Sequence, residues 1–292
     1  RIWSTETSER KVSKSMQVVI SEHAGFCFGV RRAIELVTKA VESGGELSTL
    51  GPLIHNPQEV KRLESAGVKV TADITGARCK RIVMPSHGVA QEVYDLAKES
   101  CAEIIDATCP YVSKVHRTAK ELAKAGFFVV VIGDPAHSEV KGILSAAGSG
   151  AIAVRSPEEA ASFDWTDKAV GIVSQTTQTE ERFQEIVDII RKSAKEVRAV
   201  NTICIATRQR QEAVQDVAPE VDVMFVVGGR NSANTNRLRE ICESAGVPTY
   251  HIETASEIKN EWLEGKETAG ITAGASTPDW LIEQVKDRLE KV

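Results

Sequence analysis

The stretch from residue 127 to residue 140, FFVVVIGDPAHSEV, decides which fold this chain is expected to adopt. Its first part, 127–132, is a continuous apolar run, which is typical of a strand buried on both faces of a parallel sheet. Gly133 ends the run, a polar turn follows, and a helical pattern begins near Glu139. A strand, a turn and a helix in this order predict the α/β class, with parallel strands joined by right-handed crossovers.

The same order of features occurs three times in the chain. In each unit a cysteine opens an amphipathic helical pattern, and a glycine ends a strand-like run at one fixed distance further on. The three pairs are Cys27 and Gly51, Cys109 and Gly133, and Cys204 and Gly228. A unit that recurs with one spacing predicts three small parallel-sheet α/β domains, arranged as a pseudo-threefold trefoil.

Each unit is expected to contain four strands, and the N-terminal segment is expected to supply the last one. The predicted strands are 46–50, 68–70, 81–85 and 103–105, then 127–132, 151–154, 169–173 and 197–200, and finally 222–227, 248–252, 269–273 and 17–20. The predicted division has a tail outside the fold at 1–16 and α/β domains at 28–109, 110–204 and 205–292. The N-terminal strand segment, 17–27, completes the third domain.

Composition narrows the possible functions. The 292 residues carry a formal net charge of −5 and only 5% aromatic side chains, and Lys and Arg form no block. A nucleic-acid partner is therefore not expected, since such partners require a basic surface. No apolar run is long enough to span a membrane, and no signal-peptide pattern opens the chain. We expect a cytoplasmic protein without a membrane partner, monomeric or weakly dimeric.

Polar side chains follow the predicted strands where the next helix begins. They are His55, His87, His137, Glu139, Thr176, Ser232, Asn234 and Ser276. Ligands of open α/β sheets bind beyond the carboxyl ends of the strands, and the free N–H groups of helix starts favour anions. Lys and Arg are scarce in these turns, with Arg230 as the exception. Neutral donors are therefore expected to bind a phosphate or diphosphate in a central cavity.

Cys27, Cys109 and Cys204 occupy equivalent positions at helix starts, where the pKa of a thiol is expected to be lowered. Three thiolates brought together repel one another unless a cation is shared between them. All-sulfur ligation favours zinc or an iron–sulfur cluster, and three ligands leave one metal position open. Two other functions use the same residues: a zinc-dependent phosphate-ester hydrolase, and a non-catalytic diphosphate-binding module with structural cysteines.

The remaining cysteines and histidines lack this context. Six cysteines in a chain without secretion signals argue against a disulfide framework, so Cys79, Cys101 and Cys242 are predicted to be packing residues. Cys101 is the reserve ligand because it lies shortly before Cys109. His116, inside a predicted helix, and His251, in a predicted strand, are expected to be structural.

With these residues identified, the sequence resembles a known family, the 4-hydroxy-3-methylbut-2-enyl diphosphate reductases, which catalyse the last step of the methylerythritol phosphate route to isoprenoids. The resemblance extends from about Val18 to Gln284. The segments that carry it are AGFCFGVRRAI, GPLIHNPQEV, SHGVAQEV, DATCPYVSKVH, HSEVKG, SQTTQT, NSANTNRL and GITAGASTPDW.

The resemblance implies a [4Fe–4S] cluster at the centre of the trefoil, bound through Cys27, Cys109 and Cys204, with one open iron for the substrate hydroxyl. It implies reductive dehydroxylation of 4-hydroxy-3-methylbut-2-enyl diphosphate to isopentenyl and dimethylallyl diphosphates. It also implies an electron donor such as ferredoxin or flavodoxin.

Site roles follow from the resemblance in the same way. It implies that Glu139 supplies protons, that Thr176 binds the substrate hydroxyl and relays a proton, and that His137 takes part in catalysis and lines the diphosphate. The implied substrate-binding set is His55, His87, His137, Thr176, Ser232, Asn234 and Ser276. The sequence departs from the family at Ala233, where many members carry a second serine, so one donor near the diphosphate is expected to differ.

Overall fold

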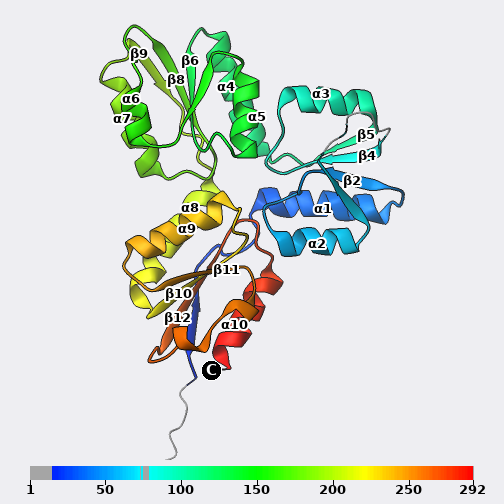
Figure 1. The fold of residues 1–292 in the computed structure, drawn as a ribbon, viewed down its shortest axis with the longest axis vertical. Helices are drawn as coiled ribbons and strands as arrows, with labels where there is room; N and C mark the ends of the chain where they lie inside the picture. The colour runs from blue at the N-terminus through cyan, green and yellow to red at the C-terminus, as the bar shows by residue number, and fades with distance from the viewer. Residues whose placement is uncertain (1–14, 73, 75–78, 292) are drawn as a thin grey trace, which may run out of the picture.

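The computed structural model describes residues 15–72, 74 and 79–291. It contains three four-stranded parallel sheets, each flanked by helices, which form three lobes around a common junction (Figure 1). The predicted α/β class and the three-lobed arrangement are confirmed. Every lobe repeats one strand order, in which the second strand lies outside the first, and the third and fourth follow on the other side.

The first sheet has the order β3-β2-β4-β5. Its elements are α1 (Phe28–Glu42), β2 (Leu47–Leu50), α2 (Pro57–Ser65), β3 (Val68–Thr71), β4 (Cys79–Met84), α3 (Gln91–Ser100) and β5 (Cys101–Asp106). β2 and β4 are parallel neighbours, but the connections that follow them lead to opposite edges of the sheet: β2 is followed by β3 on one side, and β4 by β5 on the other. This switch point is where an open α/β sheet leaves a crevice for a ligand.

The second sheet has the order β7-β6-β8-β9. Its elements are α4 (Pro110–Lys124), β6 (Phe128–Ile132), α5 (Ser138–Ala147), β7 (Ala151–Val154), α6 (Pro157–Ser162), β8 (Ala169–Ser174), α7 (Glu180–Arg191) and β9 (Glu196–Ala199). The central strands β6 and β8 are almost fully buried, because helices cover both faces of the sheet. Pro110 lies in the first turn of α4, where a missing N–H removes no helix hydrogen bond.

The third sheet has the order β1-β12-β10-β11 and takes its edge strand from the N-terminal part of the chain. Its elements are β1 (Gln17–Ile20), α8 (Ile205–Val217), β10 (Val223–Val227), α9 (Ala233–Ser244), β11 (Thr249–Ile252), β12 (Thr268–Ala273) and α10 (Asp279–Glu290), with short 3₁₀ turns η1 (Ala218–Glu220), η2 (Ala255–Glu257) and η3 (Asn260–Trp262). β1 pairs with β12 along its whole length, from Gln17 opposite Thr268 to Ile20 opposite Ile271. The predicted strand at 17–20 is therefore confirmed.

Strand ends agree with the predictions to within two residues, and the largest differences lie in the first sheet. β5 begins two residues earlier than predicted, because α3 ends at Ser100 and the strand starts at the next residue, Cys101, with no turn between them. Glu103 on β5 forms an ion pair with Arg81 on β4 at 3.0 Å. Of the predicted tail, residues 1–14 lie outside the described residues, and Met16 is buried in the core of the third sheet.

One cysteine prediction is wrong. Cys101 is disulfide-bonded, so it is neither a plain packing residue nor a reserve ligand. It lies at the start of β5, and Cys79 in β4 is its backbone register partner. The spacing of the cysteines along the sequence gives no sign of the bonded state of Cys101. The side chain of Cys79 lies outside the described part of the structure. Cys242 is a free, fully buried cysteine in the core beside β10, as predicted.

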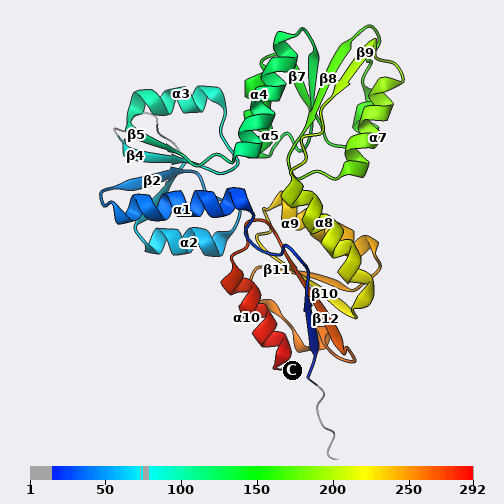
Figure 2. The ribbon, with the colours of Figure 1, turned by 180° about the vertical axis from the view of Figure 1, so that it is seen from behind.

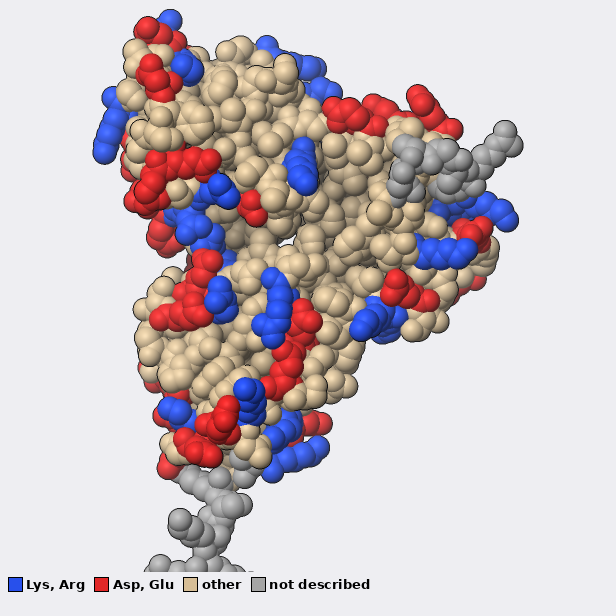
Figure 3. Space-filling view, in the orientation of Figure 1, with Lys and Arg blue, Asp and Glu red and all other residues tan. Residues whose placement is uncertain are grey.

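Within the described residues, no helix is both long and apolar enough to cross a membrane. Figure 3 shows Lys and Arg interspersed with Asp and Glu over the face drawn, rather than gathered into one continuous basic area.

Candidate active site

A cavity that is partly open to solvent lies where the three lobes meet. All eleven predicted site residues line it: Cys27, His55, His87, Cys109, His137, Glu139, Thr176, Cys204, Ser232, Asn234 and Ser276. The first turns of α1 and α8 lie at this junction in both views of the ribbon (Figures 1 and 2).

The cavity is surrounded by helix starts. Cys27, Cys109, His137, Cys204 and Ser232 are the N-cap residues of α1, α4, α5, α8 and α9. Other lining residues precede the starts of α2, α3, α7 and α10 by a few positions. Since each helix start presents unpaired N–H groups and the positive end of the helix dipole, the cavity favours an anion without a Lys or Arg.

Three free thiols share this cavity. Burial raises the pKa of Cys109 and of Cys204 above the ordinary thiol value, although backbone N–H groups of the following turn act in the opposite direction. Repulsion from the thiolate of Cys27 raises both values further. The expectation that the helix start lowers the thiol pKa is therefore wrong for Cys109 and Cys204, because desolvation outweighs the backbone dipoles.

The thiols fit an extended group better than a single ion. The Sγ atom of Cys109 lies against Gly29, where an added Cβ would approach it to 2.4 Å, so this cysteine is packed tightly against the first turn of α1. Among the described residues, no three His, Cys, Asp or Glu side chains are arranged to hold one metal ion. Three partly buried sulfurs that would repel one another as thiolates have the donor chemistry that an iron–sulfur cluster requires.

Glu139 is fully enclosed, with 3% of its surface exposed. Its Oε1 atom accepts a hydrogen bond from the backbone N–H of Thr176 at 2.7 Å, and its Oε2 atom accepts one from Thr176 Oγ1 at 3.0 Å. Burial raises the pKa of Glu139 to about 7, although both bonds from Thr176 oppose that shift. A carboxyl with this pKa both holds and releases a proton near neutral pH, as a general acid must.

Three histidine rings line one side of the cavity. The rings of His55 and His87 are stacked with centroids 4.6 Å apart, and His137 meets His55 edge-on at 5.0 Å. Burial lowers the pKa of His55 to about 4 and lowers that of His87 and His137 as well, so the three rings are neutral together. His137 Nδ1 accepts a hydrogen bond from the N–H of Glu139, which leaves its ring proton on Nε2.

Several polar atoms of this lining have no partner within the protein. They are His55 Nε2, His87 Nδ1, and both amide atoms of Asn234. Buried polar atoms are normally hydrogen-bonded, so these four are available to a ligand. Ser276 Oγ donates to the carbonyl of His55 at 3.1 Å, which joins the third lobe to the first at the cavity wall.

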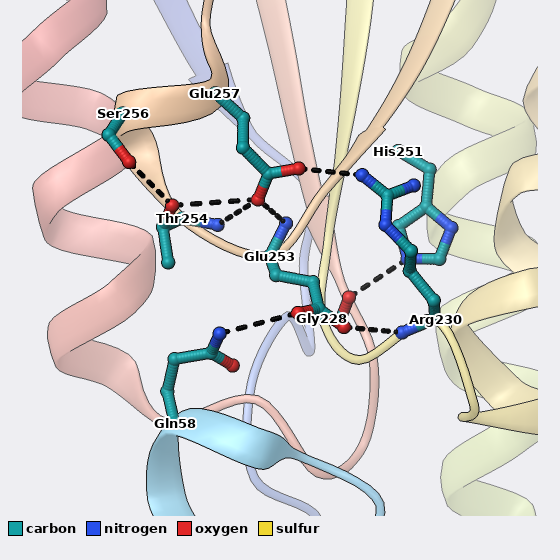
Figure 4. Close-up of polar contacts among 8 residues, drawn as sticks. All are labelled: Gln58, Gly228, Arg230, His251, Glu253, Thr254, Ser256 and Glu257. Carbon is teal, nitrogen blue, oxygen red and sulfur yellow. Dashed lines mark hydrogen bonds and ion pairs between the residues drawn. The ribbon is translucent and has the colours of Figure 1, made fainter.

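The one cationic residue expected near these turns points elsewhere. Arg230 forms an ion pair with Glu257 at 2.6 Å, and its backbone N–H donates to Glu253, as Figure 4 shows. The same network includes a contact from His251 Nε2 to the Gly228 carbonyl at 2.8 Å, and Gln58 reaches Glu253 from α2. Arg230 does not line the cavity, and this network instead braces the loop that leads into α9.

The lining residues that sequence reasoning missed include Ser86, Thr177, Thr207 and Gly29. Ser86 and Thr177 adjoin predicted residues in the SHG and SQTTQT turns, and Thr207 lies one helical turn after Cys204, so the periodicity of α8 could have indicated it. Gly29 carries no chemical signal and is recognisable only from its contact with Cys109.

The two histidines expected to be structural lie outside this cavity. His116 is in α4 and lines a separate hollow between α4, α5 and the first lobe, and its Nε2 atom is buried without a partner. His251 is in β11 and takes part in the network of Figure 4.

Three α/β lobes around a cavity that combines three free thiols, a protonatable carboxyl and uncharged anion donors define a trilobed α/β enzyme. The LytB protein family model matches residues 18–290, and the chain belongs to this family.

Relatives of known name agree with this assignment. The chain is 46% identical to the 4-hydroxy-3-methylbut-2-enyl diphosphate reductase of Aquifex aeolicus, over 95% of this chain and 97% of that protein. It is equally similar to the enzyme of the same name from Geotalea uraniireducens, over 95% and 98%. The chain is thus an oxidoreductase.

Two solved structures resemble the fold. One is titled as (E)-4-hydroxy-3-methyl-but-2-enyl diphosphate reductase, the terminal enzyme of the non-mevalonate pathway; it is 45% identical with a TM-score of 0.67, and the match covers 95% of this chain and 100% of that one. The other is the E-1-hydroxy-2-methyl-but-2-enyl-4-diphosphate reductase of Plasmodium falciparum, 26% identical with a TM-score of 0.88, over 94% and 87%.

Proposed function

We propose that this chain reduces 4-hydroxy-3-methylbut-2-enyl diphosphate. Two electrons and two protons remove the allylic hydroxyl as water and give isopentenyl and dimethylallyl diphosphates. The observation that carries the proposal is the meeting of three free thiols and one carboxyl of raised pKa in a single cavity whose other donors are neutral. The names of the relatives supply the substrate.

The residues that would hold the cofactor are Cys27, Cys109 and Cys204. A [4Fe–4S] cluster bound there would supply electrons and a Lewis-acidic iron for the hydroxyl. Three sulfur ligands would leave one iron of such a cluster open to the substrate. Each of the three thiols lies at the start of a helix in a different lobe. Val30 and Ile54 line the same cavity and would present apolar surface to such a cluster.

Glu139 is the proton donor in this proposal. Among the described residues that line the cavity it is the sole carboxyl, and at pH values below about 7 it is protonated. Thr176 bonds to both of its oxygens, which fixes the carboxyl toward the cavity and gives a hydroxyl that can pass the proton to the leaving oxygen.

The diphosphate is bound by neutral groups. His55, His87 and Asn234 offer the unpaired polar atoms described above, and Ser232 and Ser276 offer hydroxyls from the third lobe. Helix starts supply the remaining positive potential. His137, with its proton on Nε2, is placed to donate to a phosphate oxygen near Glu139.

The test is metal analysis followed by a reductase assay on protein purified without oxygen. We expect about four irons and four acid-labile sulfides per chain, lost in Cys109→Ser, and turnover with dithionite and methyl viologen. Glu139→Gln should retain the cluster and lose turnover. Zinc without sulfide, or a loaded protein that does not consume the diphosphate, would reject the proposal.

Electrons have to come from outside the chain in this reaction, and we propose a ferredoxin or a flavodoxin in the cytoplasm as their source. Exchange of the chemical reductant for each purified donor, with its own reductase, tests this part separately from the chemistry.

A further inference from the structure

Arg210 is a buried cation without a carboxylate partner. It lies in α8, less than two turns beyond Cys204, and only 4% of its surface is exposed. Within the described part of the chain it forms no ion pair, whereas two partly buried arginines do: Arg81 pairs with Glu103, and Arg237 pairs with Glu240.

The hydrogen bonds of Arg210 tie two distant segments together. Its Nη1 donates to the carbonyl of Ala206 at 2.7 Å within α8, and its Nη2 donates to the carbonyl of Gly25 at 2.6 Å. Gly25 precedes Cys27 by two residues, in the connection between β1 and α1. The Nε–H group has no partner. The guanidinium therefore spans the backbone beside two of the three thiols.

Two carbonyl bonds do not balance a buried full charge. Placing an unpaired cation in a protein interior costs several kcal/mol unless a negative group offsets it. Burial lowers the pKa of Arg210, and the groups that raise it are the thiols of Cys27 and Cys204. No carboxylate contributes, so the negative charge that this arginine faces is that of the cysteine ligands.

We propose that Arg210 is a positioning residue that holds the Cys27 segment against α8 and supplies the fixed positive charge that favours the reduced state of the bound cluster. This inference rests on the proposed function, because it requires a cluster at the three thiols. One-electron reduction adds one negative charge to the cluster and forms or breaks no bond; in the test the electron comes from dithionite. A nearby cation favours the more negative state.

The experiment compares Arg210→Gln and Arg210→Lys with the unsubstituted protein and with Arg237→Gln. Each protein is loaded with cluster, poised at a series of potentials, and scored by EPR for the ratio of reduced to oxidised cluster. Arg237→Gln is the matched control, since it removes a half-buried guanidinium whose neighbours in charge are Glu240 and Arg182 rather than thiols.

We expect Arg210→Gln to lower the reduced-to-oxidised ratio at least tenfold at a given potential, which corresponds to about 59 mV for a one-electron couple. Arg210→Lys should stay within about threefold of the parent, and Arg237→Gln should not change the ratio. An unchanged ratio in loaded Arg210→Gln, or an equal fall in Arg237→Gln, would overturn the proposal. So would a Lys variant that behaves like the Gln variant.

If Arg210→Gln fails to retain the cluster, the Lys variant decides the question. A Lys variant that binds the cluster and has the parental ratio supports the role of the positive charge. If neither variant binds the cluster, Arg210 is needed for folding, and the proposal is overturned. The proposed function is judged on the unsubstituted protein. Loaded parent protein that does not reduce the diphosphate rejects that function, whereas the EPR ratios still decide the role of Arg210.

Discussion

Replacement of Glu139 by Gln tests the most unusual ionisation in the cavity. A glutamine has the same shape, so its side-chain oxygen can still accept the N–H of Thr176, and its amide can donate to the Thr176 hydroxyl. The variant thus keeps both contacts and loses only the ionisable proton. Its effect on pH dependence can therefore be calculated from the pKa of the carboxyl alone.

The magnitude follows from proton linkage. Folding raises the pKa of Glu139 from 4.5 to about 7, so the folded protein binds more protons than the unfolded chain between these values. Stability from this group is hence greatest below pH 4.5 and falls as the pH rises toward 7 and above. The fall amounts to about 3 kcal/mol in total and about 2 kcal/mol between pH 5.5 and pH 8.

The assay is urea unfolding of parent and variant at several pH values, followed by tryptophan fluorescence, with equal iron and sulfide content in both proteins. We expect the free energy of unfolding of Glu139→Gln, minus that of the parent, to rise by about 2 kcal/mol from pH 5.5 to pH 8. All other titrating groups cancel in this difference. A difference that stays flat across the range would show that the carboxyl ionises normally and would refute the reasoning about its burial.

Three further substitutions test other parts of the cavity. Gly29→Ala places a Cβ 2.4 Å from Cys109 Sγ, so bound iron should fall severalfold while circular dichroism is unchanged; normal iron content would contradict the packing argument. Asn234→Ala removes two amide atoms that have no protein partner, so the melting temperature should not fall while KM rises at least tenfold. A lower melting temperature with unchanged KM would assign Asn234 to structure. Thr176→Val deletes the 3.0 Å hydrogen bond to Glu139 Oε2, which lowers the pKa of Glu139, so the pH profile of turnover should move about one unit higher. An unchanged profile would show that the Thr176 hydroxyl does not affect the ionisation of Glu139.

Sequence reasoning was strong where chemistry repeats and weak where it depends on packing between lobes. The apolar run before Gly133 and its two counterparts predicted the sheets, and the shared position of Cys27, Cys109 and Cys204 predicted that they meet. The thiol pKa values went the other way from expectation, because burial is a property of the assembled cavity.

The missed features have the same origin. Arg210 reads as one more helix arginine in the sequence, and only the packing of α8 against the Gly25 segment makes it a buried cation. The disulfide-bonded state of Cys101 depends on which cysteine the fold brings to it, and spacing along the chain does not encode that contact. Each case requires two segments that come together only in the fold.

The pairing of β1 with β12 has a consequence for biosynthesis. The ribosome releases β1 first, but its partner strand is among the last segments to be made, so β1 has to wait unpaired while the first two sheets form. Cys27 lies shortly after β1, and its backbone N–H bonds to the carbonyl of Ala275, so its final position also depends on the last part of the chain. A nascent chain can thus present Cys109 in a folded lobe well before the third sheet closes. We therefore expect that the proposed cluster is inserted only after translation has passed residue 271.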